Sequence, residues 1–254
     1  WAVSYIHKGE MASEAPRVLI AGGGPVGLLS AFLLARRGIA VRVFDVNPSL
    51  QDDPRAATTH PATLDLLGDV DLVDDMARVG LTAPIFQFWD RPSATKVAEF
   101  DHALLAGDTR HPFVIQCEQF KTARILLDRL KTFPKAEVLF DHEVVGVEQD
   151  AAAVTVEVKG PSGIARHSGT FLIGADGGRS VVRKAAGIAF DGFTWPERFI
   201  VLTTPFDFAR RGYCPRSYFA DPVAWCNCFK VSADGPPGLW RTVYPASPDL
   251  SEEE

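Results

Sequence analysis

The residues best placed to do chemistry form a glycine-rich run near the start of the chain, Gly22-Gly23-Gly24-Pro25-Val26-Gly27. The run follows a strand-like apolar segment and opens a helix-like one, which is the setting of a Gly-x-Gly-x-x-Gly dinucleotide-binding loop. There Gly22 would permit a tight turn, Gly24 would let a pyrophosphate approach the backbone, and Gly27 would let helix and strand pack closely. A helix that begins at Pro25 and Val26 would offer free N–H groups to the phosphates. The run predicts dinucleotide binding, and the alternative is an ordinary glycine-rich turn.

An acidic residue, Asp45, directly follows the second strand-like segment, Val41–Phe44. Its carboxylate can accept hydrogen bonds from the hydroxyls of a ribose, whereas a nearby basic residue that would suit a ribose 2′-phosphate is lacking. Asp45 therefore strengthens the prediction of a dinucleotide site. The loop and its spacing do not by themselves separate FAD from NAD.

A second glycine-rich turn occupies residues 174–183, with the sequence GADGGRSVVR. Here Asp176 and Gly177 predict a sharp reversal with an exposed carboxylate, Ser180 can cap a helix that follows, and Arg183 can face an anion. On its own this pattern is equally typical of a strand-to-helix turn with a solvated arginine.

With both motifs in this order, the chain from Arg17 to about Glu254 resembles the para-hydroxybenzoate hydroxylase-type, FAD-dependent aromatic-ring monooxygenases. In that family the first motif binds the ADP part of FAD, and a motif like the second serves both FAD and NAD(P)H. The resemblance therefore implies FAD as cofactor and places Asp176 among the residues that bind it. It further implies that Arg55, in Pro54-Arg55-Ala56, lies by the cofactor and that Gln116 hydrogen-bonds the ribityl chain. Without the resemblance, Arg55 would be an ordinary surface charge and Gln116 an ordinary polar residue before a helix.

The resemblance also implies the reaction. NADH or NADPH reduces FAD, O₂ adds to give a flavin C4a-hydroperoxide, and one oxygen atom is delivered to a small aromatic, phenolic substrate. The protein supplies orientation and a dry pocket more than an acid–base pair, so we assign no catalytic residue. Five aromatic residues in strand-like segments are candidates for a substrate pocket, although such residues more often belong to a core: Trp89, Phe219, Trp225, Phe229 and Trp240.

Two departures from the family pattern leave alternatives open. Ala62 stands where the family commonly has an arginine, and a Gly-Asp-Ala segment that binds the flavin phosphate and ribityl chain has no counterpart before Glu254. We expect a truncated chain, in which that segment would follow Glu254. The alternatives are another kind of FAD-dependent oxidoreductase and a non-catalytic fragment that keeps only the dinucleotide-binding half.

The composition excludes several other classes of function. A net charge of −6 over 254 residues leaves no basic footprint for nucleic acid or anionic lipid. No apolar run reaches the roughly 18 residues needed to span a bilayer. The four cysteines lack the spacing of a metal site and are expected to be reduced thiols, and the six histidines are scattered. We expect a cytoplasmic protein without a metal, and a homodimer is compatible with these features.

The order of predicted elements indicates an α/β fold. We expect a Rossmann-type, GR2-like FAD-binding domain, with a central parallel sheet and an antiparallel meander over residues 137–173, beside an incomplete, strand-rich substrate domain. Residues 1–10 are expected to be a tag or upstream residues. The expected FAD-binding domain comprises 11–79 and 113–187, and the substrate domain 80–112 and 188–254. Helices are expected over 60–79, 118–131 and 181–186, and the last strands over 199–203, 217–219, 223–231 and 239–244.

Overall fold

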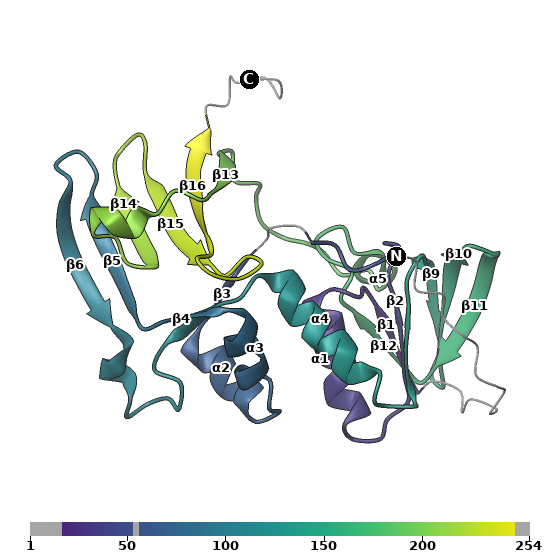
Figure 1. The fold of residues 1–254 in the computed structure, drawn as a ribbon. Coiled ribbons are helices and arrows are strands. Elements are labelled where there is room, and N and C mark those ends of the chain that lie inside the picture. Colours follow the sequence, from purple (N-terminus) through teal and green to yellow (C-terminus); the bar gives the residue numbers. More distant parts are fainter. Residues whose placement is uncertain (1–16, 53–55, 247–254) are drawn as a thin grey trace. The chain divides into compact units, whose positions relative to one another are not determined.

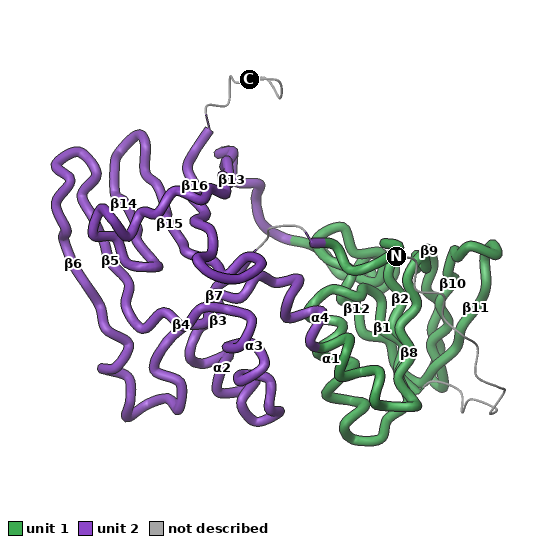
Figure 2. The backbone as a smooth tube through the Cα atoms, viewed as in Figure 1, with its two compact units in different colours: residues 1–51, 126–190 green, residues 52–125, 191–254 purple. Residues whose placement is uncertain are grey.

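The computed structural model describes residues 17–52 and 56–246. The chain divides into two compact units, coloured separately in Figure 2. Unit 1 comprises residues 1–51 and 126–190, and unit 2 comprises residues 52–125 and 191–254. Each unit is described by itself.

Unit 1 is built on a parallel sheet of four strands in the order β12-β1-β2-β8. The strands are β1 (Val18–Ala21), β2 (Val41–Phe44), β8 (Ala136–Leu139) and β12 (Phe171–Gly174). All four residues of β1 are buried, as expected for a central strand of a parallel sheet. Helix α1 (Pro25–Ala35) is apolar along most of its length and connects β1 to β2. The predicted βαβ opening is confirmed.

A second layer of unit 1 is the antiparallel meander β9 (Glu143–Gln149), β10 (Val154–Gly160) and β11 (Gly163–Gly169), drawn in green in Figure 1. Alternate residues of β10 are buried, which is the period-two pattern of a half-covered strand. Three buried meander valines, Val144, Val156 and Val158, pack in one cluster with Leu19, Ala21 and Phe44 of the parallel sheet. This cluster forms the core between the two layers.

The prediction of one antiparallel meander over residues 137–173 is wrong at both ends. Strands β8 and β12 pair in parallel with β2 and β1, so the meander contains only β9, β10 and β11. The two predicted turns do join antiparallel neighbours. Of the flanking segments, β12 is a short apolar run without alternation, and β8 is apolar except for Glu137. Such runs suit a parallel sheet, and their pairing partners lie far away in the sequence.

Unit 2 contains a six-stranded sheet in the order β13-β16-β15-β14-β5-β6. Its strands are β5 (Ile85–Asp90), β6 (Thr95–Asp101), β13 (Arg198–Thr204), β14 (Arg216–Ala220), β15 (Cys226–Val231) and β16 (Leu239–Ala246). Only β14 and β5 pair in parallel. A strand was predicted to begin at Val223, but Val223 and Ala224 belong to a turn, because their N–H groups donate to the Asp221 carboxylate at 2.8 Å each.

The rest of unit 2 is a small sheet with two helices. The sheet consists of β3 (Thr58–Thr59), β7 (Val114–Gln116) and β4 (Leu81–Ala83) in the order β3-β7-β4. The helices are α2 (Pro61–Gly68) and α3 (Val73–Val79), as predicted for residues 60–79, with a 3₁₀ turn η1 at His102–Leu105 and another, η2, at Phe208–Arg211. The division between the units falls inside helix α4 (Gln119–Leu130). Helix α5 (Val181–Ala185) belongs to unit 1.

The overall class is the α/β fold that the sequence predicts, with a parallel sheet and antiparallel strands. The predicted domain boundaries concern cofactor and substrate binding, which a division into compact units does not test. Those boundaries therefore stay a prediction.

Candidate functional site

The glycine-rich loop of unit 1 is shaped by close backbone contacts that exclude side chains at Gly22 and Gly27. Gly22 has a φ of +100°, and a Cβ there would lie 2.3 Å from the carbonyl oxygen of Ala175. A Cβ on Gly27 would lie 1.9 Å from the carbonyl oxygen of Gly22. Gly22 thus allows the turn and Gly27 allows the close packing of helix and strand, as the sequence predicts.

Gly24 differs from its neighbours, because its surroundings are open. It is the N-cap residue of α1, with an extended backbone, and no atom lies within 4 Å of the position a Cβ would take. Pro25 begins the helix, Val26 is 66% exposed, and no described side chain caps this helix end. The first N–H groups of a helix have no partner within the helix. The start of α1 therefore presents donors beside an uncovered stretch of backbone.

Asp45 points toward this loop. One oxygen of its carboxylate accepts a hydrogen bond from the Gly23 N–H at 2.6 Å, and the other accepts two bonds of 2.9 Å from the backbone and side chain of Asn47. Each carboxylate oxygen has two lone-pair positions, so Asp45 keeps accepting capacity for further hydroxyl donors. It fixes the glycine loop and can still accept from a sugar.

Gly23 is a residue whose role the sequence analysis missed. A Cβ on Gly23 would lie 2.9 Å from the Cβ of Asp45, so a side chain there would push Asp45 away from the loop. The motif treats this position as variable. The only available signal was that three glycines follow one another where the pattern demands two.

The second glycine-rich turn behaves differently from its prediction. The Asp176 carboxylate is half-buried rather than exposed, and it accepts from the Val181 N–H at 2.7 Å, the Val182 N–H at 3.2 Å and the Ser180 hydroxyl at 2.5 Å. Ser180 accepts from the Arg183 N–H at 2.9 Å, as predicted for a capping residue. The first N–H groups of a helix have no partner within the helix. Asp176 and Ser180 together accept from these N–H groups at the start of α5 and so cap it.

Arg183 does not extend freely from this turn. Its guanidinium donates to the carbonyl oxygen of Gly178 at 2.8 Å and lies 4.5 Å from the ring centroid of Phe190. The expected orientation toward an anion is therefore replaced by contacts within the turn and with an aromatic ring.

Gln116 lies in β7 of unit 2 and is fully buried. Its side-chain oxygen accepts from the Thr58 hydroxyl at 2.6 Å, whereas its amide nitrogen has no hydrogen-bond partner in the described part of the chain. An unpaired buried donor costs about 1–3 kcal/mol, so this amide fits a partner that the protein itself does not supply. Arg55, the other residue that the resemblance placed by the cofactor, lies outside the described residues.

Comparison with known proteins decides the family. Residues 16–219 match the family described as FAD binding domain. The chain belongs to this FAD-binding family.

Two relatives of this FAD-binding chain are a para-nitrophenol 4-monooxygenase from Pseudomonas sp. strain WBC-3 and a 6-hydroxy-3-succinoylpyridine 3-monooxygenase from Pseudomonas putida. The first is 33% identical over 237 residues, covering 93% of this chain and 58% of the relative. The second is 35% identical over 238 residues, covering 93% of this chain and 60% of the relative. The crystal structure of a p-nitrophenol 4-monooxygenase from Pseudomonas putida DLL-E4 superimposes with a TM-score of 0.88 at 33% identity, covering 94% of this chain and 60% of that one. The chain thus spans about three fifths of the length of these relatives.

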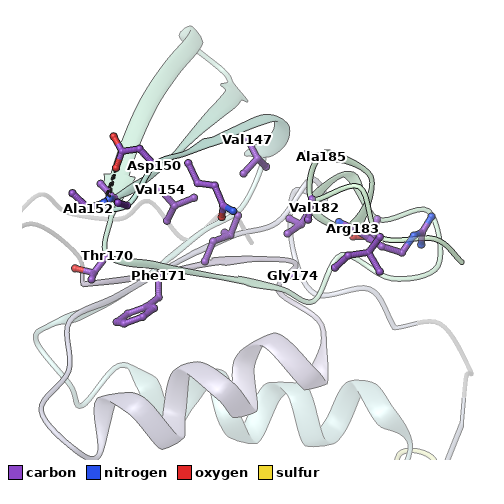
Figure 3. A pocket seen from close by; sticks show the side chains of 17 residues that line it. Val147, Asp150, Ala152, Val154, Thr170, Phe171, Gly174, Val182, Arg183 and Ala185 are labelled. Atoms are coloured by element: carbon purple, nitrogen blue, oxygen red, sulfur yellow. Dashed lines mark hydrogen bonds between the residues drawn. The ribbon is translucent and has the colours of Figure 1, made fainter.

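A groove of about 830 Å³ lies in unit 1 between the meander, β12 and helix α5 (Figure 3). It is lined on one side by β9 and β10 and on the other by Phe171, Gly174, Val182 and Arg183. Neither the glycine loop 22–27 nor Asp45 lines it, so the groove is separate from the predicted cofactor loop.

The predicted aromatic pocket residues lie on different parts of unit 2. Trp240 is only 1% exposed and its ring meets Phe208 edge-on, which makes it a core residue. Trp89 and Phe219 stack together at 6.5 Å on one face of the six-stranded sheet. Phe229 lies against Tyr218 at 5.5 Å on the opposite face. Trp225 lies against Phe199, with ring centroids 5.6 Å apart. The five residues therefore do not form one pocket.

Two kinds of feature are absent from the described residues. Among the described residues, no group of three or more histidine, cysteine or acidic side chains is placed to hold a metal ion. In the same part of the chain, no helix combines the length and apolar character that crossing a membrane would require.

Proposed function

We propose that the whole protein to which this chain belongs is an FAD-dependent, NAD(P)H-consuming monooxygenase that hydroxylates a small aromatic, phenolic substrate with O₂. The observation that carries the proposal is the open backbone at Gly24, next to a carboxylate that points toward the loop. Membership of the FAD-binding family supports it, as do two relatives named as monooxygenases of ring compounds.

In this proposal the residues of unit 1 hold the ADP part of FAD. The open backbone at Gly24 and the N–H groups of Val26 and Gly27 would hold the pyrophosphate, because this helix start has uncapped donors and the positive end of a dipole. Pro25 has no N–H, so the first donors of the helix are those of Val26 and Gly27. Asp45 accepts from a ribose hydroxyl with the one acceptor position that Gly23 and Asn47 leave free, on the oxygen that also binds the Gly23 N–H.

Three further residues have roles that depend on the family resemblance. The unpaired amide of Gln116 donates to the ribityl chain. Asp176 acts by holding the turn 174–183 in shape, since its carboxylate is already engaged with α5. Arg55 lies by the cofactor. Bound FAD supplies the redox chemistry that activates O₂, while the protein orients the ring and excludes water.

The predicted cofactor-binding and substrate-binding parts of the chain belong to the same proposal. Residues 11–79 and 113–187 bind the cofactor, and residues 80–112 and 188–254 contribute to the substrate surface. The six-stranded sheet of unit 2 is composed of strands from this second set.

The test uses purified protein, FAD, either nicotinamide cofactor and a panel of phenols under ¹⁸O₂. We expect flavin absorption bands after FAD is added, oxidation of NADH or NADPH that a phenol stimulates, and one ¹⁸O atom in the hydroxylated product. Phenol-independent oxidation without labelled product would instead indicate a flavin reductase. Protein that retains no FAD would contradict the cofactor assignment and favour a non-catalytic fragment.

A further inference from the structure

A buried ion pair lies at the start of helix α4 in unit 2. Glu118 directly precedes the helix, and Lys121 lies in its first turn. The Lys121 ammonium lies 2.9 Å from the Glu118 carboxylate, and the two side chains are only 12% and 4% exposed. Lysine and glutamate are almost never buried unless their charges are paired. The contacts of this pair therefore show what its burial achieves.

Both charged side chains bind the chain just after strand β15. Lys121 donates to the Ser232 hydroxyl at 2.7 Å and to the carbonyl oxygen of Ala233 at 2.5 Å. Glu118 accepts from the Ala233 N–H at 3.0 Å. Together with the Glu118 carboxylate, these two acceptors use the three protons of the ammonium. The end of β15, in the six-stranded sheet, is thus fixed to the start of α4.

The same cluster reaches the end of helix α3. The Ser232 hydroxyl donates to the carbonyl oxygen of Val79 at 2.5 Å, and the Lys121 ammonium lies 3.4 Å from that oxygen. Val79 is the last residue of α3, and strand β4 begins two residues later. We call Glu118, Lys121 and Ser232, with the backbone of Val79 and Ala233, the ion-pair joint. It connects the small sheet and its helices to the six-stranded sheet.

Gln116 lies on the strand that this joint holds. Its backbone pairs with Thr58 of β3 on one side and with Leu81 of β4 on the other, and Glu118 follows it by two residues. The joint therefore fixes β7 where the strand ends and β4 where it begins. The amide nitrogen of Gln116 is buried without a partner among the described residues. Apart from the bond that its oxygen accepts from Thr58, the position of this amide follows from the strand that carries it.

Stability alone does not explain an ion pair at this place. An apolar pair of similar volume is often equally stabilising or more so, because burying two charges costs most of what their attraction gains. What the ion pair adds is geometry. Charge-assisted hydrogen bonds hold their partners within a narrow range of distance and direction.

We propose that Glu118 and Lys121 are positioning residues, which fix the Gln116 amide relative to the six-stranded sheet. This inference rests on the proposed function and deepens it, because Gln116 is there a cofactor-binding residue and the six-stranded sheet contributes to the substrate surface. The ion-pair joint keeps these two parts of unit 2 at one spacing.

The test compares the wild-type protein with a double variant, Glu118→Leu with Lys121→Met. Because no single buried charge is left behind, we expect the Tm to change little. The FAD affinity should fall about 3- to 10-fold, as expected for one weakened hydrogen bond. Gln116→Leu should lower the affinity by a similar factor. Adding it to the double variant should cause no further loss, because residues that act through one another are not additive.

The matched control removes an exposed ion pair of the same spacing near the end of α4. Lys131 and Asp128 lie 2.6 Å apart with side chains 55% and 70% exposed. Asp128→Leu with Lys131→Met should leave the FAD affinity unchanged.

Hydrogen exchange provides a readout that does not need FAD. Peptides covering β7 and residues 231–238 should exchange faster in the Glu118/Lys121 double variant than in the wild type, whereas β1 should be unaffected. Unchanged exchange in β7, or losses of FAD affinity that add in the combined variant, would overturn the inference. A marked fall in Tm with unchanged FAD affinity would also overturn it, since the pair would then serve stability alone. Wild-type protein that binds no FAD would instead contradict the proposed function, while the exchange data would still test the joint.

Discussion

At the start of α1 the helix has an extended glycine as its N-cap and no described capping side chain, whereas at the start of α5 Asp176 and Ser180 accept from three successive backbone N–H groups. Both helices follow a glycine-rich turn at the end of a parallel strand of the same sheet. In the first turn the acidic residue is Asp45, which follows strand β2 and accepts from the Gly23 N–H of the loop. In the second turn it is Asp176, which belongs to the turn itself and accepts from the first N–H groups of α5. A glycine-rich turn before a helix thus offers its donors to a ligand only where the chain has not already used them.

The largest expected effects distinguish Gly27 from Gly24 in the first glycine-rich turn. Gly27→Val places a side chain against the Gly22 carbonyl and should destabilise folding by about 3 kcal/mol or more. Gly24→Val meets open space, so the Tm should change little while FAD affinity falls by about 10- to 100-fold, because the side chain occupies the place of the pyrophosphate. Thermal unfolding and FAD fluorescence titration measure both. Normal FAD binding by Gly24→Val would show that the phosphates lie elsewhere.

Asp45→Ala tests the carboxylate that binds the first loop from outside. It should weaken FAD binding by about 1–3 kcal/mol through the loss of hydrogen bonds to the ribose. Asp45→Asn is the matched control, because its side-chain oxygen can still accept from the Gly23 N–H. The asparagine variant would lose the two bonds from Asn47, because an amide NH2 cannot accept them, and it should bind FAD with intermediate affinity. An unchanged FAD affinity in the alanine variant would show that Asp45 does not bind the ribose.

Asp176→Ala tests the capped turn. The loss of a helix cap should lower the free energy of unfolding by about 1–2 kcal/mol in denaturant titration, with or without FAD. Arg179→Ala alters an exposed side chain in the same turn and serves as the control. If Asp176 instead binds only cofactor, the FAD-free variant will unfold like the wild type, and the contrast between the two turns will not hold.

The smallest expected effect concerns His167, which packs against Phe44 at the end of β2, next to Asp45. Burial, and then the charge of Arg42, lower the pKa of His167. The folded protein therefore binds fewer protons at this residue than the unfolded chain, and stability should decline as the pH falls below the ordinary value of about 6.5. His167→Asn should flatten the dependence of Tm on pH between about 5 and 6.5. If the Tm of the variant depends on pH as that of the wild type does, the pH dependence arises from groups other than His167.

The parts that the sequence predicted well depend on neighbours along the chain. The β1-α1-β2 unit, the paired helices α2 and α3, and the capping role of Ser180 follow from local patterns of apolar residues, glycine and capping residues. Asp176 was predicted as exposed, because an acidic residue before a helix start suits either a solvated turn or a cap, and only the fold of the turn decides.

The missed features depend on partners that are distant in sequence. The need for glycine at position 23 follows from the side chain of Asp45, and the parallel pairing of β8 and β12 follows from strands more than 90 residues earlier. Strand alternation places Arg216 and Tyr218 on the same face, but nothing local shows that two guanidinium nitrogens of Arg216 have no hydrogen-bond partner among the described residues. Such absences become visible only when all neighbours of a buried group are known.

The most direct test of the central claim is the position of the FAD diphosphate in a crystal structure of the protein grown with FAD. We expect the diphosphate to lie on the Gly24 backbone, within hydrogen-bonding distance of the Val26 and Gly27 N–H groups, with the adjoining ribose on Asp45. A diphosphate bound at the α5 turn, or a Gly24 niche filled by protein atoms while FAD binds elsewhere, would contradict the account.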